Sequence, residues 1–226
     1  MNVAFLKAPG VASPGSPRVA AAAYARRVAE SDRERWDARH AAAVAVGAVG
    51  PAPPDALRGR TELLPPGGRA LDVACGRGTV AVWLAARGFA VDAVDVSPVA
   101  LDAGRELAVR EGVAVRWLRH DLDDGLPEGG PYDVVVCQRF RDPARYPELA
   151  ARLAPGGLLV VTVLSEVGEG PGPFRAPAGE LLAAFAGLEV LHHVERDGEA
   201  HLVARLNAAA SDRRCPSDRR RPPGRR

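Results

Sequence analysis

The fold is decided by the stretch Arg69-Ala70-Leu71-Asp72-Val73-Ala74-Cys75-Gly76-Arg77-Gly78-Thr79-Val80. A short apolar run ends in small residues and leads into two glycines one residue apart. A helical pattern starts at once over residues 79–87 and stops at Gly88. Glycine adopts backbone angles that a Cβ forbids, and a helix start presents unpaired N–H groups. The stretch predicts a strand, a tight turn and a helix, which receive an anionic or polar ligand at the carboxyl end of a parallel sheet.

The composition is that of a folded domain. Of the 226 residues, 47% are hydrophobic, which is enough to bury a large core. No run of about 18 apolar residues occurs, so no membrane span is expected, and residues 1–7 are too short in their apolar part for a secretory signal. The cysteines Cys75, Cys137 and Cys215 are far apart and form no CxxC pair. We therefore expect no metal site, no disulfide framework and a cytoplasmic location.

Charge is distributed unevenly along the chain. Residues 207–226 contain seven Arg and two Asp, a charge of +5, so residues 1–206 must carry −3 for the chain to total +2. A mildly acidic body argues against a broad nucleic-acid surface. The tail has no aromatic residue for stacking on bases, and we interpret it as a disordered Arg-rich end. Contact with RNA or acidic lipid is the alternative for the tail.

The first part of the chain is expected to precede the sheet. Residues 1–30 contain prolines among Gly and Ser, then an alanine-rich run, which indicates a disordered or weakly helical leader. A capping box, Ser31 with Glu34, predicts a helix from about residue 32 to about residue 45 that contains Trp36.

After the glycine turn, strands and helices alternate. A second strand over 90–95 ends on Asp95, and Ser97-Pro98 starts a helix that runs to Glu111. Later elements are expected at 113–118, 132–137, 158–164, 188–195 and 199–206 for strands, and at 143–154 and 180–185 for helices. The last two strands form an antiparallel hairpin. We predict an α/β fold over residues 31–206, a three-layer, doubly wound, mostly parallel seven-stranded sheet of Rossmann-like type with a C-terminal antiparallel hairpin.

In this combination the sequence resembles the class I S-adenosylmethionine (SAM)-dependent methyltransferases, and within them the small tellurite-resistance and thiopurine-type branch. The resemblance is carried by residues 71–79, 94–98, 121–122, 132–136 and 153–159, and by 173–205 with the Gly-Glu-Leu-Leu run at 179–182. Any single piece is weak, whereas their order is specific. The resemblance implies SAM as the cofactor and a methyltransferase fold.

The cofactor residues implied by this family are Asp72, Ala74, Gly76, Gly78, Asp95, Val96, Asp121, Leu122, Gln138 and Trp36. The glycines would let the backbone wrap the methionyl part of SAM, and Asp72 would hold its ammonium. Asp95 ends the second strand, where a carboxylate accepts hydrogen bonds from ribose hydroxyls. The resemblance also implies that Asp121 binds the adenine amino group, that Leu122 flanks the ring, and that Trp36 belongs to a lid helix over the sulfonium.

The acceptor side is expected after the fourth strand, where this family meets the methionyl group and the substrate. Arg139 and Phe140 are the candidate acceptor contacts. No catalytic dyad stands out, which suits a soft thiol, selenium or tellurium nucleophile because such an acceptor needs no strong base. The sequence thus predicts methyl transfer from SAM to a small-molecule acceptor. An Asn/Asp-Pro-Pro-Tyr/Phe motif, as in nucleic-acid methylation, is absent after this strand.

Each interpretation has an alternative. The glycines alone also suit a structural turn, Asp95 a helix N-terminal acid, and Trp36 ordinary helix packing. Gly76-Arg77-Gly78-Thr79-Val80-Ala81 fits the loose pattern of an NAD-dependent oxidoreductase. A non-catalytic SAM-binding or interaction protein is the third possibility, because the loop at 174–177 lacks the Asn-Pro and aromatic residues often found in the branch.

Overall fold

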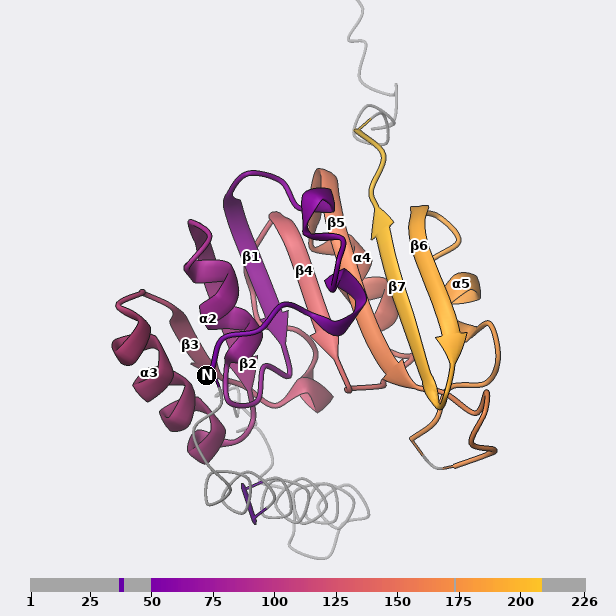
Figure 1. The fold of residues 1–226 in the computed structure, drawn as a ribbon, viewed down its shortest axis with the longest axis horizontal. Coiled ribbons are helices and arrows are strands. Elements are labelled where there is room, and N and C mark those ends of the chain that lie inside the picture. The colour runs from indigo at the N-terminus through magenta and orange to yellow at the C-terminus, as the bar shows by residue number, and fades with distance from the viewer. Residues whose placement is uncertain (1–36, 39–49, 173, 209–226) are drawn as a thin grey trace, which may run out of the picture.

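The computed structural model of the chain describes residues 37–38, 50–172 and 174–208 (Figure 1). The predicted leader, Trp36 with most of the helix expected around it, and the Arg-rich tail from residue 209 lie outside the described residues. The described part holds the whole sheet and the glycine turn.

One seven-stranded sheet forms the centre of the molecule, in the order β3-β2-β1-β4-β5-β7-β6. Its strands are β1 (Gly68–Val73), β2 (Phe89–Asp95), β3 (Arg116–Arg119), β4 (Tyr132–Gln138), β5 (Leu153–Leu164), β6 (Glu189–Arg196) and β7 (Glu199–Arg205). All neighbouring pairs are parallel except the two that β7 makes with β5 and β6. This arrangement confirms the predicted mostly parallel sheet and its closing hairpin.

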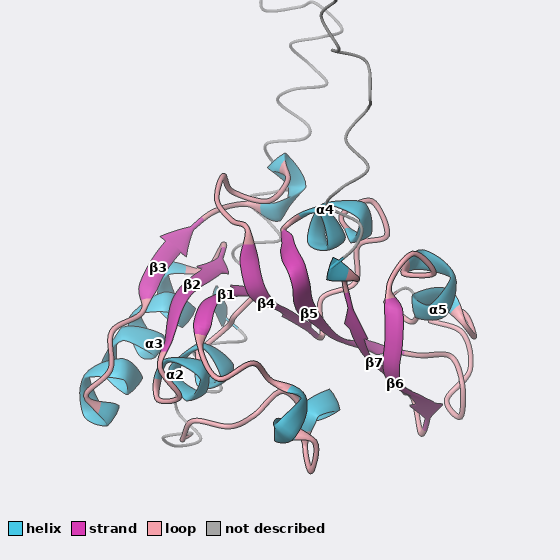
Figure 2. Cartoon of the chain, turned by 90° about the horizontal axis from the view of Figure 1, so that it is seen from above, coloured by secondary structure: helices cyan, strands magenta, loops and turns pink. Residues whose placement is uncertain are grey.

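Helices cover both faces of the sheet. α2 (Thr79–Ala85) and α3 (Pro98–Glu111) lie on one face, and α4 (Tyr146–Ala151) and α5 (Glu180–Ala184) on the other (Figure 2). Three short 3-10 helices complete the described part, namely η1 (Asp55–Leu57), η2 (Thr61–Leu63) and η3 (Leu122–Asp124). The three layers agree with the doubly wound prediction.

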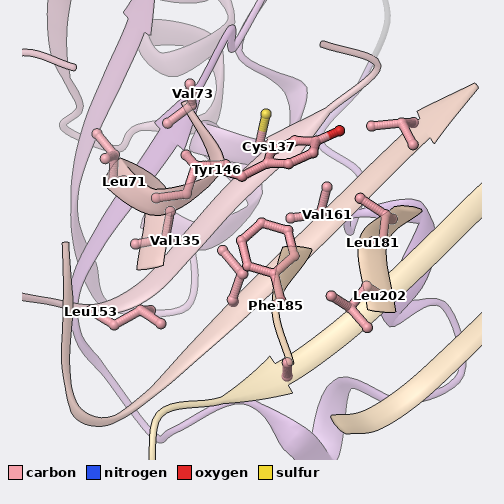
Figure 3. Packing of buried hydrophobic residues seen from close by; sticks show 14 of the residues in the cluster. Leu71, Val73, Val135, Cys137, Tyr146, Leu153, Val161, Leu181, Phe185 and Leu202 are labelled. Carbon is pink, nitrogen blue, oxygen red and sulfur yellow. The ribbon is translucent and has the colours of Figure 1, made fainter. Parts of the chain in front are cut away.

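Successive side chains of the buried strands point to opposite faces of the sheet and pack into two hydrophobic clusters, one on each face. From β4, Val135 and Cys137 join the cluster under α4 and α5, where Tyr146 and Phe185 pack with ring centroids 5.2 Å apart (Figure 3). Val134 and Val136 from the same strand join the cluster on the α2 face. Because both faces of β4 are buried, the strand is apolar along most of its length.

On the same face as α2, η1 covers the part of the sheet formed by β5 and β7. Leu57 is fully buried in the α2-side cluster, and η1 contacts both β5 and β7. A hydrogen bond of 2.7 Å from the Asp55 N–H to Gln138 Oε1 ties the same segment to the carboxyl end of β4. The segment before β1 therefore packs close to the end of the sheet where the glycine turn lies.

The predicted helix at 143–154 is shorter than expected, because Leu153 already begins β5 and pairs with Tyr132. The pairing of β4 with β5 is irregular between Tyr132 and Val134. A Cβ on Gly157 would stand 2.8 Å from the Ala154 carbonyl oxygen, so the glycine permits this tight start of the strand. The third strand, expected at 113–118, is paired only over 116–119.

Within the described part, no helix combines the length and apolar character needed to cross a membrane.

Candidate functional site

The glycine turn follows β1 at the carboxyl edge of the sheet. Ala74, Gly76 and Gly78 all have positive φ, of 53°, 52° and 70°. Cys75 donates its N–H to Val94 O at 2.9 Å, and Gly78 donates to Cys75 O at 3.0 Å, so the turn is fastened to the end of β2 and closed on itself. Gly78 is the N-cap of α2 and offers no side chain to the free N–H groups of the first turn.

Asp95 connects the glycine turn to the start of α3. One carboxylate oxygen accepts the Gly76 N–H at 2.8 Å and the other accepts the Ser97 N–H at 2.9 Å. The side chain is nearly buried, at 7% exposure. Each carboxylate oxygen can accept a further bond, so Asp95 can still bind a ribose while it holds the two turns together. Val96 stands between Asp95 and Ser97 in the sequence, where β2 leads into α3.

Asp72 stands at the carboxyl end of β1, directly behind the turn. It is 2% exposed, and its Oδ2 has no hydrogen-bond partner among the described residues. Burial, with the nearby negative charge of Asp95, raises the pKa of Asp72 to about 8, although a hydrogen bond with the Ala81 backbone acts in the opposite direction. An orphaned buried carboxylate oxygen is costly unless a donor or a cation meets it. The predicted ammonium of SAM is such a group.

Asp121 and Leu122 follow β3, as predicted, and they differ in environment. Asp121 caps η3 by accepting the Asp123 N–H at 3.0 Å, and it remains partly exposed at the site edge. Leu122 is 7% exposed and belongs to the cluster under α4. Its side chain thus has a packing role, whereas Asp121 Oδ2 makes no hydrogen bond within the described part of the chain.

Gln138 and Arg139 end β4 beside the turn. The Gln138 amide oxygen accepts from the Asp55 backbone, so it is already engaged. Arg139 has φ 57°, and its guanidinium lies 3.0 Å from Glu199 Oε1 and 3.5 Å from Asp55 Oδ2. The structure therefore places two carboxylates around the arginine that the sequence offered as an acceptor contact.

A second arginine-carboxylate group lies on the α5 side. Arg141 makes two hydrogen bonds to Glu180, and the Tyr146 hydroxyl donates to Glu180 Oε1 at 2.8 Å. Burial opposes ionisation, but these hydrogen bonds lower the pKa of Glu180 overall. Phe140 lies between the two arginines in sequence and is half-buried against the cluster under α4. The segment after β4 is thus held by an acid on either side.

His201 of β7 and Glu199 are arranged in a way that resembles a catalytic histidine–carboxylate pair. Its Nε2 lies 3.3 Å from Glu199 Oε2 and its Nδ1 lies 3.2 Å from Thr162 Oγ1. Both ring nitrogens are engaged, and Thr162 is fully buried. We interpret the group as structural support for the wall around Arg139 and Arg141. This wall is the set of carboxylates Asp55, Glu180 and Glu199.

Sequence reasoning missed the carboxylates of this wall. Glu180 and Glu199 stand 39 and 60 residues away from the arginines with which they hydrogen-bond, and the Asp55 N–H stands 83 residues away from its partner Gln138. No local spacing announces such contacts. Only the antiparallel β7, whose first residue must lie at the carboxyl edge of β5, gave a signal that could have placed Glu199 there.

Two observations show that the residues present fit SAM. Asp72 has a buried oxygen without a partner in the described part, and several acids lie at one edge of the sheet. The predicted set from β1, β2, β3 and β4 lies at the carboxyl ends of four adjacent strands. A shallow hollow lined by Thr61, Leu64, Pro65, Pro66, Arg87 and Phe89 lies at the opposite edge of the sheet, where β2 begins, and does not belong to this site. Among the described residues, no group of three His, Cys, Asp or Glu side chains is placed to hold a metal ion.

Comparison with known proteins agrees with this geometry. A family model described as "Methyltransferase domain" matches residues 70–157. The ubiquinone biosynthesis O-methyltransferase of Caulobacter sp. (strain K31) is 35% identical over 103 residues, which cover 43% of this chain and 41% of that protein. The chain thus spans about two fifths of the length of that relative.

Two solved structures share the fold. TehB from Haemophilus influenzae has a TM-score of 0.59 at 19% identity and covers 68% of this chain and 62% of its own. The 16S rRNA N2 G1207 methyltransferase of T. thermophilus, in complex with AdoMet and guanosine, has a TM-score of 0.52 at 21% identity and covers 67% and 42%. Residues 70–157 thus match a methyltransferase-domain family, and the 3-2-1-4-5-7-6 sheet has the Rossmann-like fold of these two methyltransferase structures.

Proposed function

We propose that the protein transfers the methyl group of SAM to a small, uncharged acceptor, of which a soft sulfur, selenium or tellurium nucleophile is one kind. The observation that carries the proposal is the convergence of Asp72, Asp95 and Asp121 on the carboxyl edge around the glycine turn. Three acids in these positions match the ammonium, the ribose and the adenine amino group of one ligand. An NAD-dependent oxidoreductase would leave the orphaned Asp72 unexplained.

The work left to the protein is mainly alignment. The sulfonium of SAM supplies a methyl group that is already activated, so orientation and exclusion of water provide most of the rate gain. Asp95 and the glycine turn would fix the adenosyl end, and Asp72 would fix the amino-acid end. The paired arginines after β4 would then form a preset wall beside the reacting carbon.

Charge favours an uncharged acceptor. Both arginines at 139 and 141 are neutralised by carboxylates, and Glu166 adds a further negative charge near Arg141. A phosphate or carboxylate acceptor would have to displace these acids. The known relatives differ on this point, because their names include a ubiquinone biosynthesis enzyme and an rRNA enzyme. The paired arginines favour the small-molecule type.

The first test is titration calorimetry with SAM. Asp95→Ala should weaken SAM binding by at least tenfold, because the ribose partner is lost and the two turns separate. Asp102→Ala, an exposed acid on the outer side of α3, is the matched control and should bind like the wild type. Equal affinity in wild type and Asp95→Ala would refute the assigned site, and preference for NAD in competition would refute the class of cofactor.

The second candidate is a non-catalytic SAM-binding protein. It is favoured by the engagement of both His201 nitrogens, which leaves that histidine without a free base. Incubation with methyl-labelled SAM, a panel of thiols, phenols and chalcogen oxyanions, and bulk ribosomal RNA separates the possibilities. Labelled thiols or phenols support the proposal, and labelled oxyanions alone contradict its uncharged acceptor. Binding without any labelled product supports the non-catalytic protein, and labelled RNA alone refutes the small acceptor.

A further inference from the structure

Trp117 of β3 is wedged behind the glycine turn. A Cβ on Gly78 would stand 2.3 Å from the outer edge of the indole ring, and a Cβ on Gly104 would stand 2.6 Å from the same edge. The same Gly78 position lies 3.4 Å from Gly104 Cα. The far end of the tryptophan therefore occupies the space that two side chains would need.

The two glycines belong to different elements. Gly78 caps α2 with a left-handed φ of 70°, and Gly104 lies buried in the middle of α3. Glycine inside a helix costs about 1 kcal/mol relative to alanine, so an interior glycine usually has a packing reason. Here the indole supplies that reason, because neither helix can approach β3 with a side chain at these positions.

The wedge and the Asp95 bridge act on the same two elements. Asp95 joins Gly76 of the glycine turn to Ser97, the N-cap of α3. The backbone of Trp117 pairs with Ala93 of β2, and its side chain packs against the α2-side cluster and against the small cluster shared by α2 and α3. The spacing of the two elements therefore depends on two contacts, a carboxylate bridge and an aromatic ring.

We propose that Trp117 is a positioning residue for the cofactor, which fixes the spacing of the glycine turn and the α3 start so that Asp95 and the turn meet one adenosyl group. The inference rests on the proposed function only in taking SAM as the ligand of this turn. It assigns no contact between Trp117 and the ligand. Its consequence is that the ring controls cofactor affinity through the turn against which it packs.

The test compares two tryptophans of the α2-side cluster in the full chain, the partly buried Trp117 and the buried Trp83. Trp117→Leu should raise the Kd for SAM at least tenfold by calorimetry at 15 °C, because the turn loses its backing. Trp83→Leu is the matched control, since Trp83 on α2 is 6% exposed in the same α2-side cluster. It should lower the thermal midpoint comparably and leave the Kd within about twofold. A merely structural role of Trp117 predicts the same small change in Kd for both variants.

A rescue experiment tests the wedge itself. In the wild type, Gly104→Ala should weaken SAM binding, because the new methyl group meets the indole. In the Trp117→Leu background the same substitution should strengthen binding, because the methyl group refills the emptied space. An effect of Gly104→Ala with the same sign in both backgrounds would overturn the wedge.

A second variant covers the case in which Trp117→Leu does not fold. If Trp117→Leu lacks a cooperative melt, Trp117→Phe, which keeps an aromatic ring but shortens it, decides the question by the same Kd measurement. An unchanged Kd in a folded position-117 variant overturns this inference and leaves the proposed function intact. A wild type that fails to bind SAM overturns the proposed function, and this inference with it.

Discussion

Asp72 is the residue at which local chemistry and function conflict most. Burial of a carboxyl group, one oxygen of which has no partner in the described part of the chain, costs stability. The sequence placed it correctly at the end of the first strand, because an acid inside an apolar run needs a reason. Its burial and the orphaned oxygen depend on the packing of β2 and α2 around it, which no spacing in the sequence reveals.

The pKa of Asp72 predicts a pH-dependent stability. Its value rises from 3.8 in the unfolded chain to about 8 in the fold, so the native state keeps a proton that the unfolded state releases between these values. The stability contribution of the neutral acid is complete below about pH 4 and is lost as the pH rises towards 8. Asp72→Asn removes this slope, so its stability advantage over wild type should grow with pH, by about 1 kcal/mol per pH unit.

Urea denaturation at pH 5, 6.5 and 8 measures that advantage. The same variant should bind SAM more weakly, because an amide, unlike the acid, cannot ionise to pair with the ammonium. A constant difference between the two proteins across the pH range would contradict the assignment of the raised pKa.

α3 is the element that the sequence predicted best. Ser97, Pro98 and Gly112 mark its ends, and the helix runs over Pro98–Glu111 as expected. The 143–154 helix was predicted too long, because its end depends on the pairing of Leu153 with Tyr132, a contact between strands. Local capping signals are thus reliable for element ends, whereas ends set by sheet pairing are not.

Ser97→Ala tests the cap of α3. The Ser97 hydroxyl oxygen accepts the Ala100 N–H at 3.2 Å and also donates to Asp37. Loss of an N-cap side chain costs about 1 kcal/mol, so the free energy of unfolding should fall by roughly that amount. Ser97→Thr, which retains both the acceptor for Ala100 and the donor for Asp37, should recover most of the loss in a urea titration. Equal stability of the alanine and threonine variants would contradict a capping role.

At the scale of the molecule, the carboxyl edge of the sheet is acidic although the chain carries a net charge of +2. Asp72, Asp95 and Asp121 occupy one half of this edge, and the other half pairs each arginine with a carboxylate. The sequence identified the first half, because those acids follow strand ends at regular places. The second half is assembled from η1, α5 and β7, so it emerges only in the folded chain.

Glu180→Gln should change acceptor preference by releasing the charge of Arg141. The acceptor for this test is a phenol that also carries a carboxyl group, supplied either as the free carboxylic acid or as its methyl ester. We expect the wild type to prefer the ester. The variant should shift the ratio towards the acid on the order of tenfold, equivalent to about 1.4 kcal/mol. Glu106→Gln makes the same charge change on exposed α3 and should leave the ratio unaltered. An acid preference in the wild type would contradict the proposed acceptor class.

The reversed direction of β7 has a consequence for biosynthesis. This last strand of the sheet delivers Glu199 to the carboxyl edge and is inserted between β5 and β6 rather than added at the border. A nascent chain on the ribosome can form β1 to β4, with Asp72, Asp95 and the glycine turn, before β7 has left the exit tunnel. The proposed acceptor side, which needs Glu199, is therefore completed last, and a chain whose translation stops before residue 199 would keep the glycine turn without it.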